Sequence, residues 1–123
     1  MTDETFDIEA AATGAAEATL ANGGGTFVSN DLRPSSAKSG YAVGLVQGTW
    51  DTVVPDVNAI ADAIVETLSF FPHAPYIGTW VDGDLVHVDP VIILWSYMDA
   101  VALGVANGQK SIWDIAAGEE IAL

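Results

Sequence analysis

Apolar and polar positions alternate most regularly in the second half of the chain, where they predict two strands joined by a tight turn. Residues 76–81 and 85–94 are rich in apolar side chains, and the sequence VDGD lies between them. Asp-Gly between two such segments is among the strongest signals for a β-hairpin. The two turn residues can be Asp82-Gly83 or Gly83-Asp84. Both choices predict an antiparallel pair of strands.

The segment before this hairpin reads as a strand followed by an amphipathic helix. Large and small apolar residues alternate over residues 41–47, and residues 50–54 form a connection. Pro55 suits the first position of a helix, and Pro72 cannot continue one. Between them, apolar residues recur at steps of three and four, as on the buried face of a helix. These residues are Val57, Ile60, Ile64, Leu68 and Phe71.

A second helix is predicted after the hairpin. Ser96 and Asp99 have the spacing of a capping box, with Asp in place of the usual Glu or Gln. Asn107-Gly108 forms a suitable C-terminal cap. The helix could instead begin at Asp89-Pro90, but the β-branched residues 91–93 favour a strand at that point. We therefore expect this helix to begin after Ser96.

A final hairpin over residues 111–115 and 119–122 completes the pattern. The order β-α-β-β-α-β is that of a ferredoxin-like sandwich, which belongs to the α+β class. This topology predicts a mainly antiparallel sheet with both helices on one face. The last strand is an extra one at the C-terminal edge. We assign residues 40–123 to this α+β domain.

Residues 1–39 show a different composition. The first 24 residues are rich in alanine and acids, and an expected helix over residues 7–21 has only a thin apolar stripe. Residues 23–25 are three glycines, which we interpret as a linker, and a short strand is expected over residues 26–28. This region is predicted to be an acidic N-terminal arm and loop, either mobile or weakly docked.

The predicted hairpin sorts its residues onto two faces whichever turn is used. Side chains alternate between the faces of a strand, so each register gives the same grouping. The expected core face carries Ile77, Thr79, Val81, Val86 and Val88. The opposite face is apolar with an aromatic ring, a histidine and a carboxylate, and we identify it as the candidate binding surface. It carries Trp80, His87, Asp89, Val91 and Ile93.

His87 and Asp89 point the same way and could form a base–orienter pair or two metal ligands. The simpler interpretation is a partly buried histidine beside an acid, and we favour it. His73 lies on the loop before the hairpin, and a metal site from His73, Asp82, His87 and Asp89 is conceivable, although their spacing matches no established ligand signature. No nucleophile motif, phosphate loop or dinucleotide fingerprint is present. We predict no catalytic residue, metal or cofactor, and interpret Trp50, Trp95 and Trp113 as core or interface anchors.

Charge narrows the class of partner. The 123 residues include 17 acids and three basic residues, for a formal charge of −14. A phosphate backbone or an anionic lipid surface requires the opposite sign, so direct binding to nucleic acid or membranes is not expected. An acidic surface favours a basic protein partner or metal cations, or serves solubility alone. No cysteine is present, which excludes disulfides and suits the cytoplasm.

Three segments carry a recognisable pattern: residues 76–82 (YIGTWVD), residues 86–89 (VHVD) and residues 107–114 (NGQKSIWD). With these segments, the chain from Gly40 onward resembles small proteins encoded by actinobacterial phages and prophages. It implies an accessory protein that acts in the host cytoplasm, and it assigns no catalytic residue. We therefore expect a non-enzymatic protein that binds a host or phage protein, with the candidate face also able to form a homodimer. The alternatives are a small ligand- or metal-binding domain or enzyme that uses this face, and a minor virion component.

Overall fold

The computed structural model describes residues 6–123, which form three helices and one antiparallel sheet of seven strands. The helices are α1 (Ile8–Asn22), α2 (Val57–Phe70) and α3 (Tyr97–Ala106). The strands are β1 (Gly24–Val28), β2 (Tyr41–Gly44), β3 (Asp51–Val53), β4 (Tyr76–Asp82), β5 (Leu85–Leu94), β6 (Ser111–Asp114) and β7 (Glu119–Ala122). No helix within residues 6–123 is long and apolar enough to cross a membrane.

The expected ferredoxin-like arrangement is confirmed, with additions at both edges of the sheet. The strands lie in the order β1-β4-β5-β2-β6-β7, and β3 pairs with β5. The six predicted elements correspond to β2, α2, β4, β5, α3 and β6, and every strand pairing among them is antiparallel. β7 is the extra strand at the C-terminal edge, as predicted.

The strand expected over residues 41–47 is shorter than predicted, and the expected connection contains a strand of its own. β2 pairs with residues 91–94 of β5, whereas β3 pairs with residues 86–88 of the same strand. The chain therefore leaves the sheet after Gly44 and returns at Asp51. The excursion over residues 45–50 forms part of the candidate site described below.

The register of the β4–β5 hairpin resolves the choice between the two turns. Asp82 pairs with Leu85, so Gly83-Asp84 are the turn residues, and Trp80 lies opposite His87. Gly83 adopts a φ of +59°, which a residue without a Cβ tolerates easily. Four of the five residues on the predicted core face are buried as expected, whereas Val81, near the turn, is partly buried. Ile77, Val86 and Val88 are fully buried, and Thr79 is almost so.

Both predicted helix starts are capped by side chains. Ser96 Oγ accepts a hydrogen bond from the backbone N–H of Asp99, which confirms that α3 follows the strand rather than beginning at Asp89-Pro90. α2 begins later than its Pro55 signal, because Asp56 is the N-cap and accepts from the backbone N–H of Ala59. The helix ends at Phe70, before Pro72.

The N-terminal helix differs from the expectation of a weakly docked arm. Its buried side is made of Ala12, Ala15, Ala16 and Thr19, and this side packs in the same core as α2 and the sheet. Small residues let two helices approach closely, so a thin apolar stripe suffices for tight packing. Two of the three glycines expected to form a linker belong to β1. A Cβ at Gly24 would lie 2.6 Å from the carbonyl oxygen of Thr79, so this strand needs glycine to approach β4.

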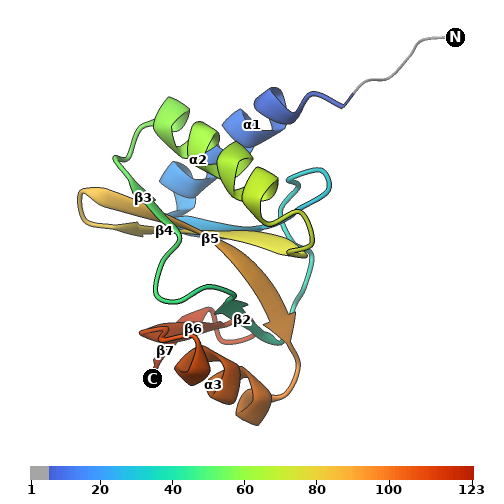
Figure 1. The fold of residues 1–123 in the computed structure, drawn as a ribbon, viewed down its shortest axis with the longest axis vertical. Coiled ribbons are helices and arrows are strands. Elements are labelled where there is room, and N and C mark those ends of the chain that lie inside the picture. Colours follow the sequence, from blue (N-terminus) through green and yellow to red (C-terminus); the bar gives the residue numbers. More distant parts are fainter. Residues whose placement is uncertain (1–5) are drawn as a thin grey trace, which may run out of the picture.

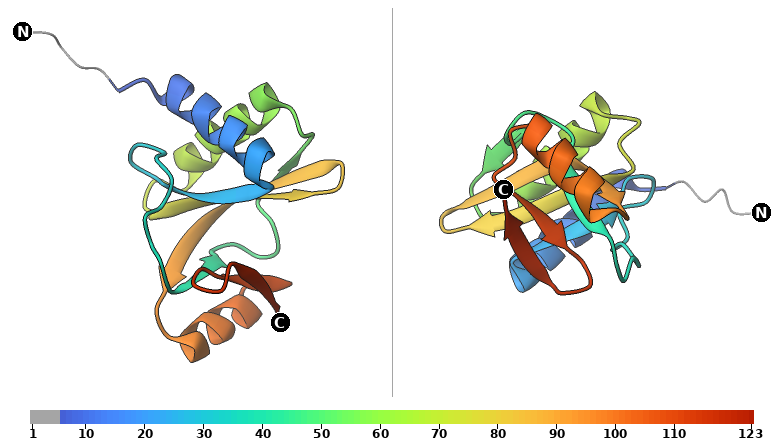
Figure 2. Two further views of the ribbon diagram at one scale, coloured as in Figure 1. Left: turned by 180° about the vertical axis from the view of Figure 1, so that it is seen from behind. Right: turned by 90° about the horizontal axis from the view of Figure 1, so that it is seen from below.

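The sheet bends so strongly that its helices lie at opposite ends of the molecule. α1 and α2 lie together over β1, β4 and β5, and α3 lies beneath β2 and β6 (Figure 1). Figure 2 shows the same separation from behind. β5 joins the two ends, since Val86 and Val88 belong to the first core while Ile92 and Leu94 pack on the second. These four residues share one face of β5, so the helices cover the outer side of the bend and leave the inner side open.

Candidate functional site

The inner face of the bent sheet is hollow. The hollow has a volume of about 390 Å³, and its walls come from β1, β4 and β5 on one side and from β2, β6 and β7 on the other. The rings of Trp80 on β4 and Trp113 on β6 meet with their centroids 5.7 Å apart. In a flat sheet these two strands would be about 14 Å apart, because β5 and β2 lie between them. Curvature therefore turns the open sheet face into a concave site.

Most of the predicted binding face lines this hollow. Trp80, His87, Asp89 and Val91 are among the lining residues. Ile93 is on the same face but is only 9% exposed, and it packs beside Gly40 rather than lining the hollow. The structure thus brings four of the five residues to one concavity, whereas Ile93 supports its end.

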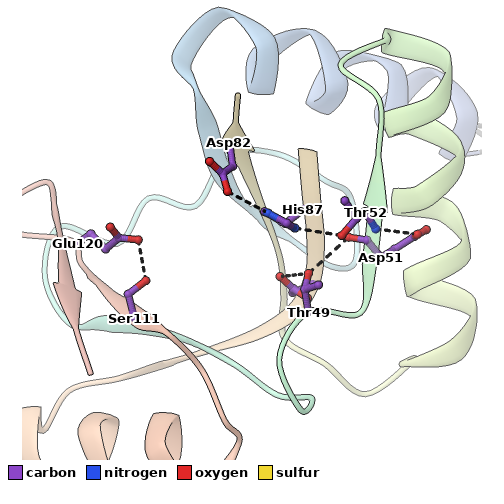
Figure 3. A network of polar contacts seen from close by, with 8 residues as sticks. Thr49, Asp51, Thr52, Asp82, His87, Ser111 and Glu120 are labelled. Carbon is purple, nitrogen blue, oxygen red and sulfur yellow. Dashed lines mark hydrogen bonds and ion pairs between the residues drawn. The ribbon is translucent and has the colours of Figure 1, made fainter. Parts of the chain in front are cut away.

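His87 and Asp89 do not contact each other through a hydrogen bond, so they do not form the base–orienter pair considered from the sequence. Thr52, the cross-strand neighbour of His87, places its Oγ1 3.0 Å from Nδ1 of the imidazole. Asp82 places Oδ2 3.5 Å from the imidazole Nε2. Figure 3 shows the His87 side chain between Asp82 and Thr52. Thr52 on β3 and Asp82 on β4, the two strands that pair with this part of β5, therefore orient the histidine.

Asp89 instead anchors the excursion over residues 45–50. Its Oδ1 accepts a hydrogen bond of 2.5 Å from the backbone N–H of Trp50 and one of 3.0 Å from Thr49 Oγ1. Burial raises the pKa of the Asp89 carboxyl above its ordinary value of 3.8, and these two hydrogen bonds act in the opposite direction. A half-buried carboxylate at the middle of β5 thus holds one wall of the hollow.

The same excursion is fastened from its other side by the turn after α3. Nε2 of Gln109 donates to the carbonyl oxygens of Val46 and Gly48, over 2.7 and 2.6 Å. Asn107 Nδ2 donates to the carbonyl oxygen of Gly44 over 2.8 Å. Asn107-Gly108 was expected only to end a helix. The amide side chains of Asn107 and Gln109 also connect α3 to the wall of the site.

Sequence reasoning missed the second wall of the hollow. Lys110, Ser111, Trp113 and Glu120 line it, and Ser111 Oγ lies 2.7 Å from Oε2 of Glu120. Figure 3 shows Ser111 and Glu120 on a separate hairpin from the His87 cluster. In the sheet, β6 lies two positions from β5. No local pattern, however, indicates the curvature that brings these residues to face Trp80.

The remaining tryptophans have different environments. Trp50 is partly buried and packs against Phe70 and Phe71 at the end of α2, with centroids 5.2 and 4.8 Å away, outside the two buried cores. Trp95 is 71% exposed, and its surroundings are described below.

Within residues 6–123, no group of three or more His, Asp or Glu side chains is arranged to hold a metal ion. His73, which the sequence left as a remote candidate ligand, is exposed in the loop between α2 and β4.

Comparisons with family models, with curated proteins and with solved structures find no match.

Proposed function

We propose that this protein is a non-catalytic binding module that holds a small ligand, or one protruding side chain, in the hollow of its bent sheet. The observation that supports this most is the meeting of Trp80 and Trp113 across about 390 Å³ of open space. A concave, aromatic-walled site with a few polar groups is the usual form of a ligand pocket. His87 and Asp82 are the polar groups beside Trp80.

The concave shape favours a small occupant over a flat protein surface. A broad partner would contact only the rim, whereas a ligand or a single side chain can reach Val91 and the glycine-lined floor. Gly44 and Gly78 line this floor, where the side chains of Gln109 and Val91 pack so closely that a Cβ would lie 2.6–2.7 Å from them. The floor therefore requires glycine at these two positions.

A variant that fills the hollow tests this proposal. Ala42→Leu adds three carbons to the floor, and Ala102→Leu makes the same change on the exposed surface of α3. A library of small molecules is screened by the indole N–H signals of Trp80 and Trp113. We expect hits that are lost in Ala42→Leu and kept in Ala102→Leu. A screen with no hit at either indole, or hits that bind Ala42→Leu equally well, would refute the proposal.

A protein–protein role is the second candidate, and a different surface supports it. Large apolar side chains that are half exposed or more lie on α3 and just before its N-cap: Trp95 (71%), Tyr97 (50%), Met98 (78%) and Val105 (62%). Asp99 is the one charged residue in the helix. Exposed apolar side chains that form a patch mark interaction sites on many proteins. The overall charge of −14 favours a partner whose apolar surface is bordered by basic residues, rather than a second copy of this chain.

Light scattering and capture with a matched pair of variants test this second role. Met98→Gln removes an apolar contact of the α3 surface, and Glu66→Gln changes an exposed residue on α2. We expect a monomer, and a captured basic protein whose binding weakens with added salt and with Met98→Gln alone. A homodimer that Met98→Gln dissociates would show that the partner is a second copy. The phage-type setting and a virion role remain predictions, and mass spectrometry of purified particles tests the latter.

A further inference from the structure

The two indole rings that meet in the hollow form a corner rather than a stack. Trp80 and Trp113 are inclined at 64°, in an edge-to-face arrangement. In such a pair the edge of one ring covers part of one face of the other, and the pair itself leaves the remaining ring faces uncovered. Trp80 is 39% exposed, so its ring is accessible from solvent. Free indole faces carry the negative side of the ring quadrupole and attract cations.

The charged side chains around this corner are mostly acidic. Three carboxylates line the hollow, namely Asp82, Asp89 and Glu120, and Lys110 is the one ammonium group among the lining residues. Asp89 is occupied by its hydrogen bonds to residues 49 and 50. Asp82 is 71% exposed and Glu120 is exposed at the edge of the sheet, so each has oxygens available to a ligand. With His87 counted as neutral, the lining has an excess of negative charge.

The rings and the carboxylates attract the same kind of ligand. Each carboxylate is close to one ring in the sheet, since Glu120 pairs directly with Trp113 and Asp82 lies two residues from Trp80. A cation against an indole face gains from the ring and from the neighbouring carboxylate together, and the gain is larger where water is partly excluded. A neutral ligand of the same shape gains neither. An anionic ligand is repelled.

We infer that the hollow binds a cation, the ammonium or guanidinium group of a small amine or of a basic side chain, against the rings of Trp80 and Trp113. This inference rests on the proposed function, because it names the class of ligand for the same hollow. The cation lies between the indole corner and the carboxylates of Asp82 and Glu120. Lys110 borders the same space, and its positive charge offsets part of the negative charge of the lining.

A matched pair of probes tests the sign of the ligand. Choline and 3,3-dimethylbutan-1-ol have the same shape, but only choline carries a positive charge. Both are titrated into the full-length protein, and the four indole N–H signals are followed by NMR. We expect choline to bind about ten-fold more tightly than the neutral alcohol, and to shift the signals of Trp80 and Trp113. Trp50 and Trp95 do not line the hollow, so their indole signals should not shift and provide an internal control.

Variants at the rim separate charge from shape. Asp82→Asn with Glu120→Gln keeps the size of both side chains and an acceptor for Ser111. We expect this double variant to lose about ten-fold in affinity for choline and none for the neutral alcohol. A capped Gly-Arg-Gly peptide distinguishes the source of the cation. Tighter binding of the peptide than of choline indicates a basic side chain of a partner, and the reverse order indicates a free amine.

Two results would overturn the inference, and they differ in what they say about the proposed function. Equal affinity for choline and its neutral analogue at Trp80 and Trp113 refutes the choice of a cation and leaves the hollow as a binding site. Titrations of choline and of the arginine peptide that shift neither indole signal, well above millimolar concentration, refute the inference directly. If the small-molecule screen then yields hits lost in Ala42→Leu, the proposed function stands without it.

Discussion

Replacing Asp89 by alanine should destabilise the protein by removing the anchor of the excursion over residues 45–50. The carboxylate accepts from the backbone N–H of Trp50 and from Thr49 Oγ1. A hydrogen bond to a charged group contributes about 1.5–3 kcal/mol. Thr49 is exposed and can turn to water, so the loss comes chiefly from the partly buried N–H of Trp50. We therefore expect Asp89→Ala to lower the free energy of unfolding by about 1.5–3 kcal/mol.

Asp89→Asn is the matched control, because it keeps an acceptor in the same place and removes the charge. One amide oxygen can accept from Trp50, while the amide NH₂ group can donate to Thr49. Urea unfolding followed by tryptophan fluorescence gives the two free energies at neutral pH. At this chain length the melting temperature moves by roughly 4 °C per kcal/mol, so a thermal scan gives a second reading. The reasoning fails if Asp89→Ala unfolds like the wild type, or if Asp89→Asn costs as much as Asp89→Ala.

The pKa of Asp89 adds a pH dependence of known sign. Burial raises this pKa in the folded protein above the ordinary value of 3.8. Between the ordinary and the raised value the folded state binds more protons than the unfolded state, so stability falls as pH rises through this window. We expect the wild type to lose stability relative to Asp89→Asn from pH 4 upward, until Asp89 is ionised in both states. A difference between the two proteins that is constant over this range would contradict the assigned pKa direction.

Two further predictions concern the packing of α1. Thr19 and Thr79 share a buried hydrogen bond of 2.7 Å between their hydroxyl oxygens. Thr79→Val should therefore lower the free energy of unfolding in urea by about 1 kcal/mol. The double variant Thr19→Val/Thr79→Val should lose less than the sum of the two single variants. Additive costs would show that the two hydroxyls are not coupled. Ala16 is fully buried whereas Ala10 is exposed, so Ala16→Glu should abolish cooperative unfolding and Ala10→Glu should leave it intact. If circular dichroism shows that Ala16→Glu is folded, α1 is not tightly packed and is instead a loosely attached arm.

The local features of this chain were determined by its sequence. Alternation along β4 and β5 sorted their residues onto two faces, because neighbouring side chains of a strand point in opposite directions. Gly83 in the turn, Ser96 at the start of α3 and the period of α2 each act over a few residues, so each was predictable. The candidate face of Trp80, His87 and Asp89 followed from the same local rule.

Tertiary structure alone decided how these elements pack together and which residues meet at the candidate site. The docking of α1 was not predictable from periodicity, because the alanines at its interface contribute close approach rather than a large apolar stripe. The partners of Asp89 come from residues 49 and 50, some forty positions away, and no spacing in the sequence indicates them. The hollow itself depends on the bend of β5 between two separate cores. That bend brings Trp113 against Trp80, and it arises from packing summed over the whole sheet, which local patterns do not record.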